Sequence, residues 1–300
     1  MNKKVLITGA TGFIAQKMIH LLLEKGYKIN TLSRKRIVDP RINSFLWDIE
    51  KNQVEETAIE EVGCIIHLAG ENIGAKSWTI EQKEHIISSR VKSTHMLFEL
   101  LAKKKIMLDC YIGASATGFY GNVNDHIVDE ESPAGHNFLA ETCVLWEKAH
   151  QNLLSFTKRH IIMRIPMVLD ANQGAFPKLI ISYPLSLNYF GKGDQYMPWI
   201  HVEDLCKVVL FFMENTTTTG IYNINAPENT RQKEFIKSLA KLKKPISPVF
   251  GIPSIALKIG LGESASLVLD GQCCSSKKLI QTGFQFQYGM LSECLKNLVK

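Results

Sequence analysis

The feature that most constrains the fold of this 300-residue chain is a glycine-rich turn near its amino terminus. An apolar run over residues 5–7 stops at Gly9, and an amphipathic stretch from about 13 to 25 follows before Gly26. This order predicts a strand, a tight turn, a helix and a glycine stop. Glycine at such a turn lets the backbone approach a pyrophosphate, and the helix N-terminus offers free N–H groups to its charge. We interpret the segment as the first βαβ unit of a dinucleotide-binding fold.

The motif itself is Gly9-x-x-Gly12-x-x-Ala15. Glycines often mark ordinary turns, so the spacing is weak alone and gains weight from its place between a strand and a helix. Ala15 in the third position is compatible, because that position serves helix–strand packing. Thr11, Phe13 and Ile14 belong to the same turn and are expected to contact the cofactor.

The residues that distinguish NAD(H) from NADP(H) are expected at the end of the second apolar segment. Ser33, Arg34 and Lys35 follow one another there. An acidic residue there would bind a ribose 2′-hydroxyl, whereas Arg34 and its neighbours suit a 2′-phosphate. The alternative interpretation is a solvated basic loop. The sequence favours NADP(H) over NAD(H).

Composition excludes several other classes. The net charge of +6 is mild, and no aromatic-interleaved basic patch indicates a nucleic-acid partner. No apolar run is long enough to span a membrane and no signal peptide is evident, so we expect a cytoplasmic protein. The seven cysteines form no CxxC pair and no histidine cluster accompanies them, so neither a disulfide framework nor a metal site is expected.

Strand and helix patterns alternate through the first half of the chain. Apolar runs near 44–47, 63–70, 109–115 and 161–165 read as strands, and 80–101 and 138–154 as helices. Such alternation predicts an α/β, Rossmann-type, doubly wound parallel sheet. We expect a cofactor domain over 1–165, rejoined by about 200–228. A smaller, mainly helical substrate region would fill 166–300, with a C-terminal module from about 245.

The predicted strands end on residues that suit a cofactor cleft. Asp48 and Ile49 follow one strand, and residues 68–70 (Leu68, Ala69, Gly70) end the next. Small residues there let a cofactor lie close to the backbone. A later strand ends on the hydroxyl of Ser115, and Pro166 stops another.

Several of these stretches together resemble the extended short-chain dehydrogenase/reductases. They are residues 9–14 (GATGFI), 68–70 (LAG), 115–117 (SAT) before Tyr120, and 199–205 (WIHVEDL). Residues 70–73 (GENI), 88–91 (SSRV), 146–147 (WE) and 269–272 (LDGQ) are similar to an atypical branch, the YfcH-type epimerase family, also described as nucleoside-diphosphate-sugar epimerases. The resemblance covers essentially the whole chain.

The resemblance implies NADP(H) in a Rossmann cleft and a substrate, such as a nucleotide sugar or another carbonyl compound, held by the C-terminal region. The family's catalytic set would be Asn, Ser or Thr, and Tyr-x-x-x-Lys. Ser115 matches the hydroxyl position, but Arg90 stands near the Asn position, and Leu139 and Cys143 stand where the Tyr and Lys would be. Leucine transfers no proton and a neutral thiol supplies no positive charge. Tyr120 is the alternative candidate for the catalytic hydroxyl group.

Two hypotheses therefore stay open: an NADP(H)-dependent oxidoreductase or epimerase-like enzyme with atypical catalytic residues, and an NADP(H)-dependent sensor or partner-binding protein without turnover. The oligomeric state is not predicted. The expected cofactor contacts are Gly9, Thr11, Gly12, Phe13, Ile14, Ser33, Arg34, Lys35, Asp48, Ile49, Leu68, Ala69, Gly70, Arg90 and Pro166, with Ser115 and Tyr120 as candidate catalytic residues.

Overall fold

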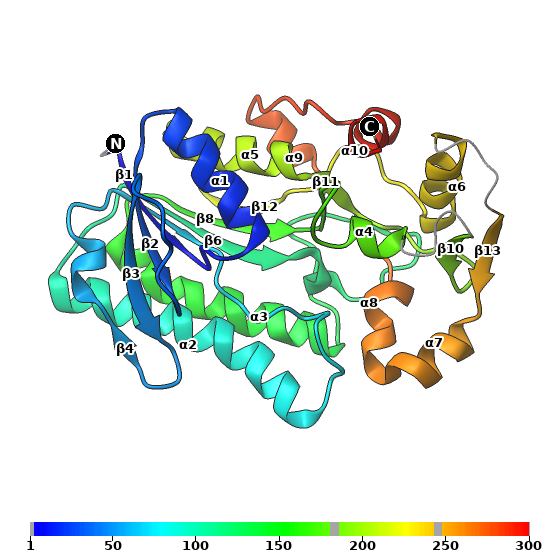
Figure 1. Ribbon diagram of the computed structural model, residues 1–300, viewed down its shortest axis with the longest axis horizontal. Helices are drawn as coiled ribbons and strands as arrows, with labels where there is room; N and C mark the ends of the chain where they lie inside the picture. The colour runs from blue at the N-terminus through cyan, green and yellow to red at the C-terminus, as the bar shows by residue number, and fades with distance from the viewer. Residues whose placement is uncertain (1–2, 181–185, 243–247, 300) are drawn as a thin grey trace.

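A single eight-stranded sheet organises the computed structural model, which describes residues 3–180, 186–242 and 248–299 (Figure 1). The strand order is β12-β8-β6-β5-β1-β2-β3-β4, and neighbours are parallel except for the antiparallel pair β3–β4. The chain winds outward from β1 in both directions, which confirms the predicted doubly wound sheet. The strands are β1 (Lys4–Thr8), β2 (Lys28–Ser33), β3 (Ile42–Asp48), β4 (Gln53–Val54), β5 (Cys64–His67), β6 (Cys110–Ala116), β8 (His160–Ile165) and β12 (Gly220–Asn223).

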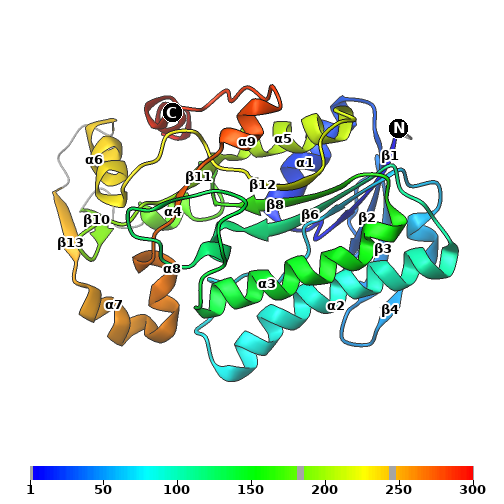
Figure 2. The same ribbon diagram turned by 180° about the vertical axis from the view of Figure 1, so that it is seen from behind.

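Helices cover both faces of this sheet (Figures 1 and 2). One layer contains α1 (Phe13–Glu24), α5 (Val202–Glu214) and α9 (Lys277–Gln281), and the other contains α2 (Ile80–Lys104) and α3 (Phe138–Gln151). Successive side chains of β1 point to opposite faces of the sheet, so Val5 and Ile7 pack with the first layer and Leu6 packs with the second. Each such fully buried side chain contributes about 1.5–3 kcal/mol. Among the described residues, no helix is both long and apolar enough to cross a membrane.

The helices begin and end largely where the sequence predicts, with two corrections. The α2 helix starts after Thr79, whose hydroxyl accepts the N–H of Gln82 at 3.2 Å, and continues to Lys104, beyond the expected end at 101. The α3 helix is capped by Asn137 and stops at Gln151, where the chain tightens into the 3₁₀ turn η3 (Asn152–Phe156) instead of continuing to 154.

A second lobe holds most of the carboxyl-terminal chain. Its separate core includes Phe176, Trp199, Phe235 and Leu295. Within 200–228, where we expect the chain to rejoin the cofactor domain, β12 pairs with β8 of the main sheet. The expected start of a C-terminal module at about 245 lies outside the described residues. The division at 165 stays a prediction. The elements of this lobe are β9 (Met167–Leu169), α4 (Phe176–Leu179), β10 (Leu187–Phe190), β11 (Trp199–His201), α6 (Gln232–Leu242), β13 (Val249–Ile252), α7 (Ser254–Leu261), η4 (Gly262–Ala265), α8 (Ser266–Leu269) and α10 (Leu291–Leu298). Three further elements are η2 (Thr117–Tyr120), β7 (Ile127–Val128) and β14 (Cys273–Cys274), of which β7 pairs with β14, and Tyr120, Val128 and Cys274 pack together in a small cluster.

The carboxyl ends of β1 and β5 are tied together by the Thr8 hydroxyl. Its oxygen accepts the N–H groups of Leu68 and Ala69 at 3.2 and 3.3 Å. Those amides therefore bond to a side chain instead of a strand backbone, and β5 stops at His67 rather than continuing to residue 70 as the apolar pattern suggests. The result is an irregular segment over 68–70 at the edge of the sheet.

The Thr8 hydroxyl also bonds to Nδ1 of the buried His67 at 2.6 Å. On the other side of the ring, Nε2 lies 3.0 Å from the hydroxyl oxygen of Thr94, which donates its own hydrogen to the carbonyl of Arg90. Thr94 can then only accept, so Nε2 carries the ring hydrogen and Nδ1 accepts from Thr8. A second ring proton would break this arrangement. Burial lowers the pKa of His67 to about 3.

We predict that His67 makes the fold sensitive to acid. Its imidazole stays neutral in the folded chain but protonates near pH 6.5 once unfolded, so the unfolded state gains protons and stability falls as pH drops. Between pH 7 and pH 5 this one group should remove about 2 kcal/mol of unfolding free energy. Urea unfolding at several pH values should show a shallower dependence for His67→Gln. The control is the same change at the exposed His136, His136→Gln. An identical slope of unfolding free energy against pH for the native chain and His67→Gln would contradict the assignment.

Candidate functional site

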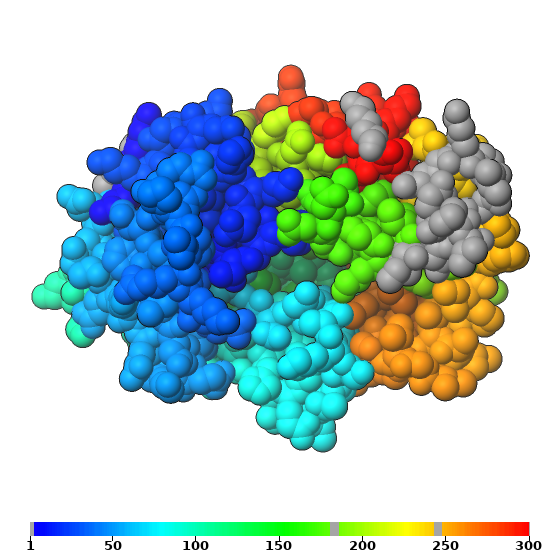
Figure 3. Space-filling view, in the orientation of Figure 1, coloured from blue at the N-terminus to red at the C-terminus, as the bar shows by residue number. Residues whose placement is uncertain are grey.

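A cleft of about 430 Å³ opens at the carboxyl ends of β1, β2, β3 and β5. Figure 3 shows this face of the molecule hollowed between the blue N-terminal part, the cyan start of α2 and the green segment after β9. Parallel-sheet proteins bind their ligands at this edge, beside the point where the strand order reverses. Most of the predicted cofactor residues line the cleft, namely Gly9, Thr11, Gly12, Ser33, Arg34, Asp48, Ile49, Leu68, Ala69 and Gly70.

The turn after β1 has the geometry of a phosphate cradle. Gly9 has a φ of +67°, and a Cβ there would lie 2.8 Å from the carbonyl oxygen of Leu68, so only glycine is accommodated. Gly12 donates its N–H to the carbonyl of Gly9 at 2.9 Å and forms the N-cap of α1. As the N-cap residue, Gly12 has no side chain to cap α1, which leaves first-turn N–H groups available to an anion.

Cationic side chains flank the end of β2. Arg34 is exposed on the cleft wall, and the buried hydroxyl of Ser33 donates to the carbonyl of Lys35 at 2.5 Å. Lys35 itself is exposed but outside the cleft lining, and the neighbouring Arg36 is held by an ion pair with Glu55. Arg34 is thus the basic residue of this run that faces the cleft.

One wall of the cleft was not predicted. Gln82, His85 and Ser89 of α2 line it at spacings of three and four residues, which place them on one face of the helix. The spacing of these three residues in the sequence could have indicated that they share one helix face. The Ser89 hydroxyl accepts the N–H of Glu71 at 2.9 Å and so fixes the loop after β5 against α2. Further lining residues not predicted are Trp47, Glu50, Glu71 and Lys76.

Four predicted contacts besides Lys35 lie outside the lining. Phe13 and Ile14 pack against the core below α1, and Pro166 is buried between β8 and β9. Arg90 lies under the loop after β5, where its guanidinium donates to the carbonyls of Ile86 and Glu71 at 2.9 and 3.1 Å.

Arg90 supports this loop from below. A Cβ at Gly70 would lie 3.1 Å from its guanidinium carbon, and the same carbon lies 5.0 Å from the Trp146 ring centroid. Burial lowers the pKa of Arg90. Its bond to Glu71 uses the main-chain carbonyl, so the positions of the two residues reflect loop packing.

Ser115 belongs to a buried charged network beneath the second lobe. Its hydroxyl donates to Glu147 Oε1 at 2.7 Å. Arg164 donates to both oxygens of the same carboxylate, each at 2.9 Å. The hydrogen bonds and charge of Glu147 raise the pKa of Arg164 above its usual value, although burial acts to lower it. Removing either partner would leave an unpaired buried charge, typically a loss of 3–5 kcal/mol.

Tyr120 continues the same network. Its hydroxyl accepts from Arg164 Nη1 at 2.9 Å and donates to Asn223 Oδ1 at 2.7 Å. Burial raises the pKa of Tyr120. Its single hydrogen is therefore used inside the protein, whereas Ser115 Oγ keeps lone pairs to offer. The catalytic roles of Ser115 and Tyr120 stay predictions.

Leu139 and Cys143 lie on the first turns of α3, beside these groups. Leu139 packs against Gly118, where a Cβ would lie 3.4 Å from its own. Cys143 is buried next to Ser115 and Arg90, and burial raises the pKa of its thiol to about 11. The thiol is therefore neutral near pH 7.

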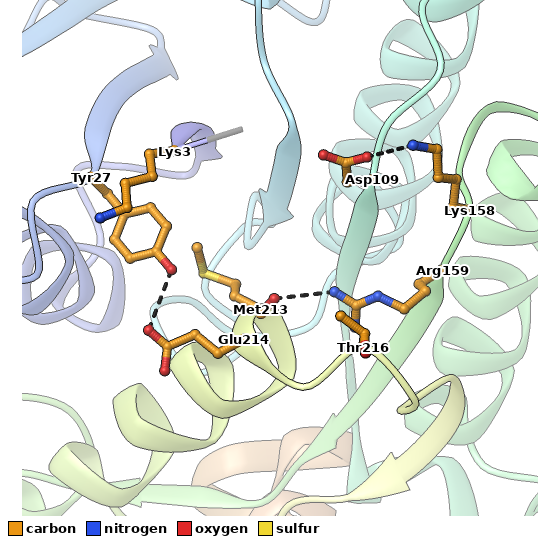
Figure 4. A pocket seen from close by; sticks show the side chains of 8 residues that line it. All are labelled: Lys3, Tyr27, Asp109, Lys158, Arg159, Met213, Glu214 and Thr216. Atoms are coloured by element: carbon orange, nitrogen blue, oxygen red, sulfur yellow. Dashed lines mark hydrogen bonds and ion pairs between the residues drawn. The ribbon is translucent and has the colours of Figure 1, made fainter. Parts of the chain in front are cut away.

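A second hollow, about 460 Å³, lies at the opposite edge of the sheet (Figure 4). Several of its polar groups are paired within the protein: Lys158 pairs with Asp109 at 2.8 Å, and Arg159 donates to the Met213 carbonyl at 3.2 Å. Tyr27 lies 3.5 Å from Glu214. Because this edge carries the amino ends of the strands, we do not take it as the cofactor site.

Comparison with known proteins agrees with this geometry. Residues 5–142 and 156–225 match the sequence model of the NAD dependent epimerase/dehydratase family, and residues 252–298 match a domain of unknown function, DUF1731. Epimerase family protein YfhF of Bacillus subtilis is 32% identical over 98% of this chain and 97% of its own.

Solved structures show the same fold. The human epimerase family protein SDR39U1 (isoform 2), determined with NADPH, superposes with a TM-score of 0.88 at 25% identity over 98% of both chains. UDP-glucuronic acid 4-epimerase from Bacillus cereus, in complex with UDP-glucuronic acid and NAD, reaches a TM-score of 0.78 at 20% identity over 98% of this chain and 96% of that one. With the matched sequence, the glycine turn and the strand order in agreement, this chain belongs to the NAD-dependent epimerase/dehydratase family within the short-chain dehydrogenase/reductase fold.

Proposed function

We propose that the protein is an NADP(H)-binding oxidoreductase or epimerase-like enzyme that works without the Tyr-x-x-x-Lys pair. The observation that carries the proposal is the cleft itself, in which an uncapped helix N-terminus, the Gly9 turn and Arg34 face one space. The residues fit a dinucleotide, because the turn at Gly9 brings the start of α1, whose N-cap Gly12 has no side chain, to the cleft at the carboxyl edge of the sheet. The NADPH in the related human structure supports the 2′-phosphate assignment.

When bound, the nicotinamide would supply or accept a hydride. The chain's own part is to hold the two phosphates at α1, the 2′-phosphate at Arg34 and the substrate oxygen near Ser115. Because Ser115 gives its hydrogen to Glu147, its oxygen would accept a hydrogen bond from the alcohol form of the substrate, which a carbonyl becomes after taking the hydride and a proton from solvent. Structural neighbours that hold UDP-sugars support a small carbonyl or nucleotide-sugar substrate.

We expect Arg34→Ala to weaken NADPH binding by about tenfold or more while changing NADH binding little, since one charge-assisted phosphate contact is lost. Calorimetric titration of the native chain and the variant with NADPH and with NADH measures both affinities. Lys35→Ala is the matched control, because Lys35 is equally exposed but lies outside the cleft lining. Equal losses for NADPH and NADH in Arg34→Ala would contradict the 2′-phosphate assignment.

A second candidate function is an NADP(H)-dependent sensor or partner-binding protein without turnover. It is favoured by Leu139 and the neutral Cys143, and by the Tyr120 hydroxyl, which is used inside the protein. On this view cofactor binding changes the protein's conformation or its contacts, and no proton donor is needed.

Turnover separates the two functions. As an enzyme, the protein should oxidise NADPH with at least one member of a carbonyl panel that includes UDP-sugars. Ser115→Ala should lower kcat by about 10²-fold or more and leave NADPH affinity intact, because the proposal places the substrate oxygen at the Ser115 hydroxyl, which lies outside the lining of the cofactor cleft. Binding of NADPH without oxidation across the panel would support the sensor instead.

A further inference from the structure

A turn of the second lobe lies against the first turn of α1, beside the phosphate cradle. It spans residues 170–174, directly after β9, and a backbone bridge between Leu169 and Gly174 closes it. The Asp170 carboxylate accepts two main-chain N–H groups of the turn, both at 3.0 Å. The shape of the turn is therefore set by its own hydrogen bonds.

Two contacts fix this turn to α1. Gly174 has a φ of +74°, and a Cβ there would lie 3.0 Å from the ring of Phe13, the residue that follows the N-cap Gly12. One helical turn further along α1, Lys17 Nζ lies 3.2 Å from Asp170 Oδ2. The Asp170 carboxylate is buried, whereas the Lys17 side chain is half exposed. An ion pair and a ring contact thus join the second lobe to the start of α1.

The turn lies on the side toward which a bound dinucleotide extends. α1 begins at the carboxyl end of β1, and β9 continues from the carboxyl end of β8, which β6 and β5 separate from β1. With its adenosine half beside Arg34 and its diphosphate at α1, the cofactor would extend its nicotinamide half toward β6 and Ser115. Figure 3 shows the green segment after β9 meeting the blue N-terminal part at the edge of the hollow.

We propose that the Lys17–Asp170 pair positions the start of α1 for the cofactor's diphosphate and couples cofactor binding to the second lobe, an inference that rests on the proposed function. The N-cap Gly12 has no side chain, so anion binding there depends on where the backbone N–H groups of α1 lie. Holding those groups in place before the ligand arrives removes an ordering cost from binding. Lys17 and Asp170 are therefore positioning residues, which act through α1.

The test is a double-mutant cycle on NADPH affinity, measured by calorimetry, with Lys17→Met and Asp170→Asn. Asparagine keeps the oxygen that accepts the N–H groups of the turn, so the second change removes only the charge. We expect each single variant to lower NADPH affinity about fivefold or more, and the double variant to lose no more than the weaker-binding single variant. Lys17→Arg restores the charge and should bind NADPH within about twofold of the native chain.

NADH provides the second readout. It carries the same diphosphate and no 2′-phosphate, so each single variant should weaken NADH and NADPH by the same factor, unlike Arg34→Ala. The matched control is Lys25→Met, the same change at the exposed C-cap of α1, which should alter neither affinity. Melting temperatures without cofactor are recorded for every variant.

Tighter NADPH binding by Asp170→Asn, or additive losses in the double variant, would place the Lys17 ammonium on the cofactor itself and overturn the positioning role. A loss confined to NADPH would overturn it as well. Unchanged affinities with a lower melting temperature would make the pair a structural contact only. If the native chain binds neither NADPH nor NADH, the proposed function fails instead, and the two failures are distinguishable.

Discussion

The close approach of the β1 turn to the end of β5 is the contact on which the site depends. A side chain at Gly9 would collide with the Leu68 carbonyl at 2.8 Å, so the two segments can meet only because position 9 is glycine. Thr8 holds the approach by accepting the N–H groups of Leu68 and Ala69, and His67 extends the bonds to α2 through Thr94. The floor of the cleft is therefore held by buried hydrogen bonds, which are stronger where water is excluded.

The two ends of the site differ in their electrostatics. At the proposed cofactor end, Arg34 and the start of α1 present positive charge to the cleft, and no described acidic side chain forms an ion pair with Arg34. At the expected substrate end, Arg164 is neutralised by Glu147 and stacked 3.5 Å from the Phe119 ring centroid. An anion is attracted to the first, whereas the second is a rigid support that orients Ser115.

Much of the frame follows from local pattern. The glycine turn, the strand at its start and α1 lie within 24 residues, and their order predicts the βαβ unit because turn and helix preferences are local. Boundaries failed where a tertiary contact replaced a local one. The expected strand over 63–70 stops at His67 because Thr8, 60 residues away in sequence, captures the Leu68 amide.

The sequence by itself determined the fold class, the glycine turn and the basic residue at the end of β2, since each depends on residues adjacent along the chain. Only the tertiary structure decided the rest. Ser115, Glu147, Arg164 and Asn223 come from four separate elements and meet only when β6, β8, β12 and α3 pack together. Gln82 is likewise an ordinary helical residue in the sequence. Only the fold buries its amide nitrogen beside the cleft, where it has no hydrogen-bond partner among the described residues.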